Sequence, residues 1–584
     1  MLKKISLNGE WEFVIDPQER GLDWCQYQIK NPAGAYPEGA GDLHDYYDDL
    51  LLDKVEVPGC WQLYKPEYKW YQGSAFFIRS FERPELAAKE RVFIHFEGVS
   101  FRARVWLNGT ELEMPDVPYL PLEAEITDLL EDENYLTVKV EGNSRSDDTL
   151  PQFGWMNFAG IIRPVWLNIT ERKRFELVLL DPELDLEAEK GCLKVRAKSD
   201  VGFSSGEQLE WTLEGQDLKE EGSLEVTGNG TRREFTTSYS KVSFWSPDSP
   251  ILYKFTLKWI SCKGTVLDIC EKHVGFREFI AKDGKFLLNG KEIFLRGISR
   301  HNIHPEYGMS LPDAAIKADL DLITELGCNM IRLPHYPQDS SVLEECDRQG
   351  LLAWVEIPVY WDAPLENPVT RKRMLNQLEI MVKRDYNHPS VAIWSMANEI
   401  HSDRAETLAC FTKARTLIRS YDPKRPVTFA SWPRNADANL GLKMVDMCCL
   451  NRYRGWYDPD YPKIARELDE MQNAYPDRPI FLSEFGAGAQ PGKHDPKQGK
   501  WSEEYQAELL EKVLNIAREH ACGASIWVLA DFMDPSRVSM KITNGLVNNK
   551  GLVSEDRKYR KLAYEKVKQI YNQWKREDAA SQLK

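Results

Sequence analysis

The sequence lacks several features that would assign the protein to a large class. No apolar run in its 584 residues is long enough to span a bilayer. The opening, Met1–Gly9, has two lysines but no apolar core, so we expect no secretory signal and a cytoplasmic location. Basic residues are outnumbered, with 75 Lys and Arg against 91 Asp and Glu, a net charge of −16. Because this charge repels polyanions, we expect neither nucleic acid nor a membrane as a partner.

Motifs for several kinds of ligand and nucleophile are absent too. The chain has no GxGxxG for a dinucleotide, no Walker loop for a phosphate and no GxSxG for a serine nucleophile. His301 and His304 lie close together, but no acidic residues stand directly beside them to complete a metal site. We therefore expect no metal and no cofactor. The eleven cysteines include no CxxC pair, which favours reduced core thiols over a disulfide framework.

What the chain does contain is two β-rich regions followed by a different pattern, and its length predicts two to four domains. Residues 1–170 hold short alternating segments and a hairpin signal at Asn108-Gly109, which predict a jelly-roll-type β-sandwich. Residues 171–275 continue the alternation between polar turns, which predicts an immunoglobulin-like β-sandwich. The clearest alternating segments of the first region are 91–100, 101–109 and 135–142.

The pattern changes over residues 276–584, where apolar runs alternate with segments of helical period. One such segment, 313–326, carries apolar residues on one face and ends at Gly327. Eight runs are candidate strands, which predicts a (β/α)8 TIM barrel, since a doubly wound sheet would need a glycine-rich loop after a strand. The eight runs are 293–299, 329–335, 352–358, 391–399, 427–431, 444–451, 480–486 and 524–531.

Two glutamates lie at the ends of strands of this predicted barrel, Glu399 at the end of the fourth and Glu484 at the end of the seventh. The carboxyl ends of barrel strands meet at one mouth, so we expect the two side chains to face each other there. Paired carboxylates cleave glycosidic bonds, with retention when they are about 5 Å apart and with inversion when they are farther apart. The acid partner needs a raised pKa, which an apolar setting and a neighbouring negative charge both supply.

Many segments resemble glycoside hydrolase family 2, which includes β-galactosidases, β-glucuronidases and β-mannosidases. In the β-rich regions they are LNGEWEF, VPGCWQ, FEGVSFRARVWLNG, NFAGIIRPVWL, FWSPDSPILYKFTL and HVGFREF. In the barrel they are FLRGISRHNIHPEYG, IRLPHYP, MANE, LNRYRGWY and SEFGA. Within the family, CLNRYRGWY, WSEEYQ, IWVLADF and NNKGLVSEDRKYRK resemble β-glucuronidases. The resemblance implies a retaining exo-glycosidase that hydrolyses terminal β-D-glucuronides by double displacement.

The resemblance also implies roles for individual residues. Glu399 would be the acid/base, Glu484 the nucleophile, and Tyr453 the residue that orients the nucleophile. Asn548 and Lys550, in the N-x-K pattern of NNKG, would bind the carboxylate at C6 of the sugar, where an ammonium and an amide are suitable partners. The remaining residues expected to line the sugar subsite are His335, Asn398, Asn451, Tyr457 and Trp527.

Several alternatives stay open. The Asp that precedes the NYAGI-like segment in glucuronidases is replaced here by Gly154, and Asp147 or Asp148 would have to supply the lost contact. A β-galactosidase or β-galacturonidase of the same family is the nearest alternative, and a non-catalytic carbohydrate-binding protein is a more distant one. The resemblance implies a homodimer or homotetramer, although no sequence feature demonstrates self-association.

Overall fold

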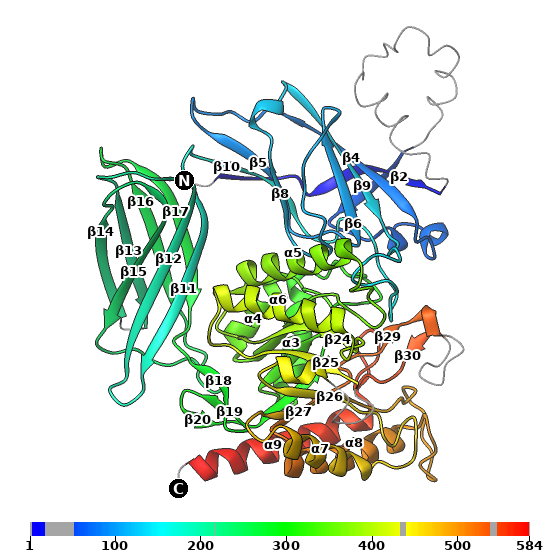
Figure 1. Cartoon of the computed structure of the whole chain (residues 1–584). Coiled ribbons are helices and arrows are strands. Elements are labelled where there is room, and N and C mark those ends of the chain that lie inside the picture. Colours follow the sequence, from blue (N-terminus) through cyan, green and yellow to red (C-terminus); the bar gives the residue numbers. More distant parts are fainter. Residues whose placement is uncertain (1–2, 18–51, 217, 433–439, 538–545, 583–584) are drawn as a thin grey trace, which may run out of the picture.

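The computed structural model describes residues 3–17, 52–216, 218–432, 440–537 and 546–582. Three bodies follow one another along the chain: an N-terminal sandwich, a second sandwich, and a barrel that both sandwiches contact (Figure 1). This arrangement confirms the predicted fold class.

Two antiparallel sheets form the first sandwich, and its core is built from the inward residues of alternating strands. The predicted hairpin is present between β6 and β7, where Asn108 (φ 49°) and Gly109 (φ 80°) both adopt the left-handed conformation of a tight turn. One sheet has the order β1 (Lys3–Ser6), β10 (Val165–Thr170), β5 (Arg91–Phe96), β8 (Leu122–Glu125). The other has the order β3 (Asp53–Val57), β2 (Gly9–Asp16), β4 (Ser74–Glu82), β9 (Glu133–Glu141), β6 (Arg102–Leu107), β7 (Thr110–Glu111).

The second sandwich packs a three-stranded sheet on a four-stranded sheet. Strand β12 shows most plainly why the two sheets pack face to face, because its residues alternate between the core and the surface over most of its length. The three-stranded sheet has the order β11 (Phe175–Asp185), β12 (Lys190–Phe203), β15 (Gly230–Tyr239). The four-stranded sheet has the order β14 (Leu218–Glu225), β13 (Gln208–Gly215), β16 (Tyr253–Ile260), β17 (Val266–Val274). A small sheet then leads into the barrel: β18 (Phe279–Lys282), β19 (Lys285–Leu288), β20 (Lys291–Glu292).

Eight parallel strands close the barrel, as predicted. Nearly every strand residue is buried, as expected where helices cover the outer face and side chains fill the interior. The strands are β21 (Leu295–Ser299), β22 (Met330–Leu333), β23 (Leu352–Glu356), β24 (Val391–Asn398), β25 (Val427–Ser431), β26 (Cys448–Asn451), β27 (Ile480–Phe485) and β28 (Gly523–Ile526). The helices are α3 (Asp313–Glu325), α4 (Ser340–Gln349), α5 (Pro368–Asp385), α6 (Ala405–Tyr421), α7 (Lys463–Ala474), α8 (Glu503–His520) and α9 (Leu562–Gln582).

Some predicted boundaries were wrong. The run at 444–451 begins as the end of a 3-10 helix, Leu440–Met444, and only its last four residues form β26. The run at 524–531 leaves the barrel after Ile526, and residues from Trp527 onward form a loop that leads to β29 (Phe532–Met533), which pairs with β30 (Val547–Asn548). Helix α9 continues to Gln582, and the last two residues lie outside the described part.

Candidate active site

The side chain of Glu399 lies just beyond the end of β24, at the carboxyl end of the barrel. Its backbone is in the left-handed region (φ 52°), a conformation that costs a non-glycine residue about 1–2 kcal/mol. The amide of Glu399 donates to the carbonyl of Ala430 on β25 at 2.8 Å, which holds the strained residue in place. Strand β24 therefore ends at Asn398, and the carboxylate of Glu399 points away from the strand into the barrel mouth.

Two nitrogen donors hold the carboxylate of Glu399. Asn451 Nδ2 donates to Oε1 at 2.7 Å and Trp361 Nε1 donates to Oε2 at 3.0 Å. Ser483 Oγ donates to Asn451 Oδ1 at 2.7 Å, so the Asn451 amide can turn only its nitrogen toward Glu399. Trp361 itself has a left-handed backbone (φ 48°), and its ring stacks on Tyr360 at 4.2 Å between centroids. Two strained residues thus meet at this bond.

The second carboxylate, Glu484 on β27, is almost completely buried and is held from two sides. Arg332 Nη1 donates to Oε1 at 2.6 Å, and Tyr453 Oη donates to Oε2 at 2.9 Å. Burial, followed by the charge of Glu484, raises the pKa of Tyr453 well above its ordinary value, so this hydroxyl stays protonated and remains a donor. The geometry leaves Glu484 a fixed carboxylate oriented by one cation and one phenol.

Arg332 links the two halves of the site. Its Nη2 donates to Asn398 Oδ1 at 2.9 Å and to Glu356 Oε2 at 3.2 Å, while Nη1 holds Glu484. Burial alone would lower the pKa of Arg332, but the charges of Glu356 and Glu484 outweigh it and raise that pKa. Burial alone would raise the pKa of Glu356, but Arg332 and His335 together lower it. Both groups are therefore charged, and the ion pair is dry.

Aromatic rings form a wall beside these polar groups. His335 donates or accepts through Nδ1 with Glu356 Oε1 at 2.8 Å, and its ring stacks on Trp527 at 5.3 Å between centroids. Trp155, from the N-terminal sandwich, lies 5.9 Å from the ring of His335 and 5.2 Å from that of His301. Burial, then the charges of His335 and Arg332, lowers the pKa of His301 well below its ordinary value, so His301 is neutral. The first domain therefore completes the wall of the barrel mouth.

Lys550 is buried among three aromatic rings. Its Nζ lies 5.6 Å from the ring centroids of Tyr453 and Tyr457 and 5.7 Å from that of Trp456. Because Tyr453 binds Glu484 directly, this ammonium lies one side chain away from the buried carboxylate. Asn548, at the end of β30, accepts the backbone N–H of Lys550 at 3.3 Å, which fixes the turn between them.

The structure brings the predicted residues to one end of the barrel. Glu399, Asn398 and Asn451 form one hydrogen-bonded group, and Glu484 with Tyr453 another, while His335 and Trp527 stack beside them. Tyr457 packs 5.4 Å from Tyr453 and is half-exposed at the rim. Their roles in catalysis remain predictions.

Sequence reasoning missed several members of this site. Arg332 was visible as a charge inside the apolar run NMIRLPH, and a charge in a buried strand indicates a buried ion pair. Glu356 was visible in the same way, as a charge inside the apolar run 352–358. Trp155 and Trp361 gave no local signal, because each reaches the site from a loop whose position depends on the tertiary fold.

Asp147 and Asp148 lie at a different contact. Both form ion pairs with Arg373 on α5, at 3.1 and 3.2 Å, and Asp148 also pairs with Arg102. They join the N-terminal sandwich to the outer face of the barrel. Trp155, the residue after Gly154, contacts the mouth of the barrel through the ring of His335.

No group of three or more His, Cys, Asp or Glu side chains in the described ranges is placed to hold a metal ion. No helix there is long and apolar enough to cross a membrane.

Comparison with known proteins identifies the class. The chain matches the family models described as "Glycosyl hydrolases family 2, sugar binding domain" over residues 4–170, "Glycosyl hydrolases family 2" over 175–277 and "Glycosyl hydrolases family 2, TIM barrel domain" over 279–575. With the closed barrel, these matches define the protein as a glycoside hydrolase. More particularly, the chain belongs to glycoside hydrolase family 2.

Individual relatives are named for two different uronides. The putative beta-glucuronidase of Formosa agariphila is 27% identical over 563 residues, which cover 88% of this chain and 66% of that protein. The beta-glucuronidase of Rattus norvegicus is 29% identical over 538 residues, 85% of this chain and 80% of that one. A solved GH2 beta-galacturonidase from Eisenbergiella tayi bound to galacturonate has a TM-score of 0.80 and 29% identity, covering 98% of this chain and 97% of that one.

Proposed function

We propose that the protein is a retaining exo-β-glucuronidase and that the barrel carries its chemistry. The observation behind the proposal is that Glu399 and Glu484 belong to one hydrogen-bonded network. Asn451 binds Glu399 and Asn398, and Arg332 binds Asn398 and Glu484. Two carboxylates with different partners can take different roles. Glu484 accepts from a cation, Arg332, and from the phenol of Tyr453, as suits an oriented nucleophile, while Glu399 accepts from the neutral N–H donors of Asn451 and Trp361.

In the first step the Glu484 carboxylate attacks the anomeric carbon, and Glu399 donates its proton to the glycosidic oxygen as the bond to the aglycone breaks. In the second step the Glu399 carboxylate takes a proton from water, and the resulting hydroxide attacks the same carbon and releases Glu484. Arg332 and Tyr453 keep Glu484 aimed during both steps. Trp361 and Asn451 keep Glu399 aimed at the leaving oxygen.

The sugar would be recognised by the remaining polar groups. Asn398 uses its oxygen to accept from Arg332, so its NH₂ group is the part oriented for the 2-hydroxyl of the sugar. Lys550 places a cation next to Tyr453, and a carboxylate at C6 is the sugar substituent that a buried ammonium selects. Trp527 and His335 supply a flat wall against which the sugar ring can pack.

A β-galacturonidase is the second candidate. Galacturonate and glucuronate carry the same carboxylate and differ only at the fourth carbon, so the Lys550 site fits both. The similarity to the Eisenbergiella tayi enzyme favours this candidate, and the similarity to the Rattus norvegicus enzyme favours the first.

A panel of nitrophenyl glycosides tests the proposal. We expect the β-glucuronide to be hydrolysed with a kcat/KM at least about tenfold above the β-galacturonide and far above the β-galactoside. Faster hydrolysis of the galacturonide would select the second candidate, and faster hydrolysis of the galactoside would contradict both. Glu484→Gln should lower kcat by at least about 10⁴-fold on every substrate, because it removes the nucleophile. Unchanged hydrolysis by Glu484→Gln would refute the catalytic assignment.

A further inference from the structure

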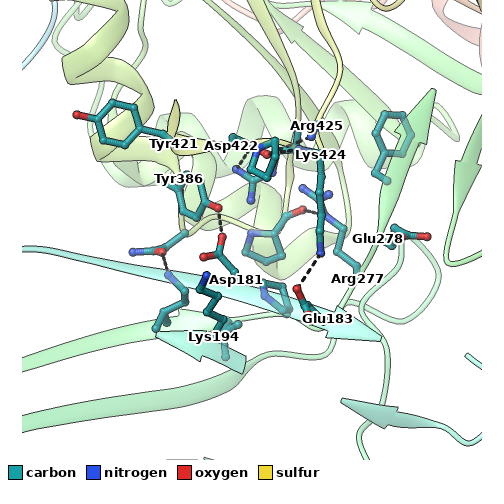
Figure 2. Close-up of a pocket in the computed structure, with 18 of the residues that line it drawn as sticks. Asp181, Glu183, Lys194, Arg277, Glu278, Tyr386, Tyr421, Asp422, Lys424 and Arg425 are labelled. Carbon is teal, nitrogen blue, oxygen red and sulfur yellow. Dashed lines mark hydrogen bonds and ion pairs between the residues drawn. The ribbon is translucent and has the colours of Figure 1, made fainter. Parts of the chain in front are cut away.

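A second polar cavity lies between the second sandwich and the barrel (Figure 2). Its volume is about 260 Å³, and since a water molecule takes about 30 Å³ in the liquid, it has room for a group several waters in size. The sandwich side is formed by β11, β12 and residues 274–279. The barrel side is formed by residues 386–389, which precede β24, and 419–425, which precede β25. The cavity therefore lies at the amino ends of the barrel strands, opposite the active site.

The lining is cationic although the protein is strongly acidic. Six Lys and Arg residues and four Asp and Glu residues face the cavity, against a net charge of −16 for the whole chain. The cations are Lys194, Arg196, Arg277, Arg419, Lys424 and Arg425, and the acids are Asp181, Glu183, Glu278 and Asp422. This excess of positive charge is confined to the cavity, and the ion-pair partners of each side chain show which cation lacks a carboxylate.

The two inner acids are already fully engaged. Asp181 accepts two hydrogen bonds from Arg196, at 2.7 and 3.1 Å, and another from the hydroxyl of Tyr386. Asp422 accepts from Trp394 Nε1 at 2.8 Å and from the backbone N–H groups of Lys424 and Arg425. Asp422 also lies 3.5 Å from Arg425 Nη1, so each inner acid already has its own arginine partner.

Arg277 is the lining cation that forms no ion pair within the described residues, whereas the other five each have a carboxylate partner. Its guanidinium is buried, and Nε donates to the carbonyl of Pro389 at 2.7 Å while Nη2 donates to that of Val391. No carboxylate among the described residues forms an ion pair with it. Burial, and then the charge of Arg425, lowers the pKa of Arg277 to about 9, so it is still a cation at neutral pH and its environment opposes that charge.

The rim supplies two further cations. Lys194 pairs with Glu234 on the neighbouring strand, and Lys424 lies 3.6 Å from Glu183 across the mouth of the cavity. Both lysines are about half-exposed, so each can turn toward a ligand at little cost. A group with two negative charges would meet Arg277 at the base and the two ammonium groups at the rim.

We propose that this cavity binds a phosphate group, as the free ion or as part of a phosphorylated small molecule. Phosphate fits because its oxygens accept the planar fork of an arginine and the point charges of two lysines together. A bound dianion would also join β11 and β12 to the loops before β24 and β25, and so stabilise the junction between sandwich and barrel. The proposal does not depend on the sugar that the active site accepts.

Isothermal titration calorimetry on the full chain, in a chloride buffer of constant ionic strength, tests the proposal. Inorganic phosphate and glycerol phosphate distinguish the free ion from the ester, and acetate is the singly charged control. We expect a saturable heat with a Kd at or below about 1 mM for at least one phosphate, and at least about tenfold weaker binding of acetate. No saturable heat with either phosphate, or acetate binding as tightly, would overturn the proposal.

Variants locate the binding. Lys424→Gln and Lys194→Gln should each weaken phosphate binding at least about fivefold, because each removes one rim charge. Lys219→Gln, on β14 of the same sandwich, removes an exposed, ion-paired lysine that does not line the cavity and should have no effect. Lys550→Gln, at the other end of the barrel, should also leave phosphate affinity unchanged. Phosphate affinity that falls in Lys550→Gln but not in the two rim variants would assign the anion to the active site and reject the cavity.

Discussion

The two ends of the barrel each bury an arginine, and they stabilise it in opposite ways. At the carboxyl end, Arg332 lies between Glu356 and Glu484, and these carboxylates raise its pKa despite complete burial. At the amino end, Arg277 donates to carbonyl oxygens, and burial with the charge of Arg425 lowers its pKa to about 9, although Asp422 and Asp347 oppose that shift. Burial is the same at both ends, so the difference comes from the partners.

The carboxyl end therefore holds an arginine within complete ion pairs, whereas the amino end holds a buried arginine with no ion pair among the described residues. Around Arg332 every buried charge has an opposite partner, as a site that must hold a carboxylate in one orientation requires. Arg277 forms no ion pair among the described residues, which is tolerable at a junction between domains, where an outside ion can supply a close counter-charge. The predictions below test whether the two ends differ as described.

The largest effect should come from Arg332→Lys. Lysine keeps the charge but lacks the fork that binds Glu484, Glu356 and Asn398 together, so we expect kcat/KM to fall about 10³-fold. Steady-state kinetics with a nitrophenyl glucuronide measures this. Arg296→Lys is the matched control, since Arg296 is buried at the start of β21 and pairs with Asp578. Its kcat/KM should stay within about threefold of the wild type, and equal losses in both variants would erase the distinction between the ends.

A smaller effect is expected from Lys550→Ala. Loss of a buried cation that faces a carboxylate should lower kcat/KM for the glucuronide about 10²-fold and leave any galactoside activity nearly unchanged. The ratio of the two rates is the measurement. Lys500→Ala is the control, because Lys500 also packs over Trp456 but is exposed. A parallel fall in both activities would mean that Lys550 serves folding and not recognition of the sugar acid.

Trp361→Phe should have a selective effect of about tenfold. The change keeps the ring and removes the N–H that holds Glu399, so it should slow substrates whose leaving group needs a proton and spare those with a highly acidic phenol. Rates across a series of aryl glucuronides give the slope against leaving-group pKa. Glu399→Gln sets the upper limit of that slope. If Glu399→Gln gives a steep slope and Trp361→Phe gives the wild-type slope, the positioning role of Trp361 is rejected and the role of Glu399 is not.

The smallest effect concerns the amino end of the barrel. His388 Nδ1 lies 2.6 Å from Asp347 Oδ2. Burial opposes the charged imidazole, but Asp347, helped by Asp385 and opposed by Lys272, raises the pKa of His388 above its ordinary value of 6.5. A raised folded pKa means that the pair stabilises the protein below pH 6.5 and loses this contribution as pH rises through the folded pKa. Urea midpoints measured from pH 6 to 9 should fall more in the wild type than in His388→Gln.

Much of the architecture was predictable because it depends on local patterns. Period-two alternation marked the strands of both sandwiches, and the helical segment at 313–326 became α3 within one residue. Errors occurred at 444–451, where apolar residues precede the strand, and at 524–531, where they continue past its end. An apolar run reports burial, and burial extends into loops that pack against the core, so it does not locate the last ladder bond.

The candidate site was predictable to the extent that it lies on barrel strands. Asn398, Glu399 and Glu484 stand at strand ends, and all strand ends of a barrel meet at one mouth whatever the loops do. The partners that orient them were less accessible. Arg332 was detectable only as a charge in an apolar run, and Trp361 lies on a loop between β23 and α5.

The sequence by itself determined the order of the three bodies, the family, and the two carboxylates of the mouth, because strand period and short motifs are properties of neighbouring residues. Only the tertiary structure decided that Arg332 joins Glu356 and Glu484 to Asn398, that Trp155 crosses from the first domain to the wall of the mouth, and that Arg277 is buried with no ion pair among the described residues. These contacts join residues far apart in the chain, and their energies depend on burial and on partner charges, which no short stretch of sequence contains.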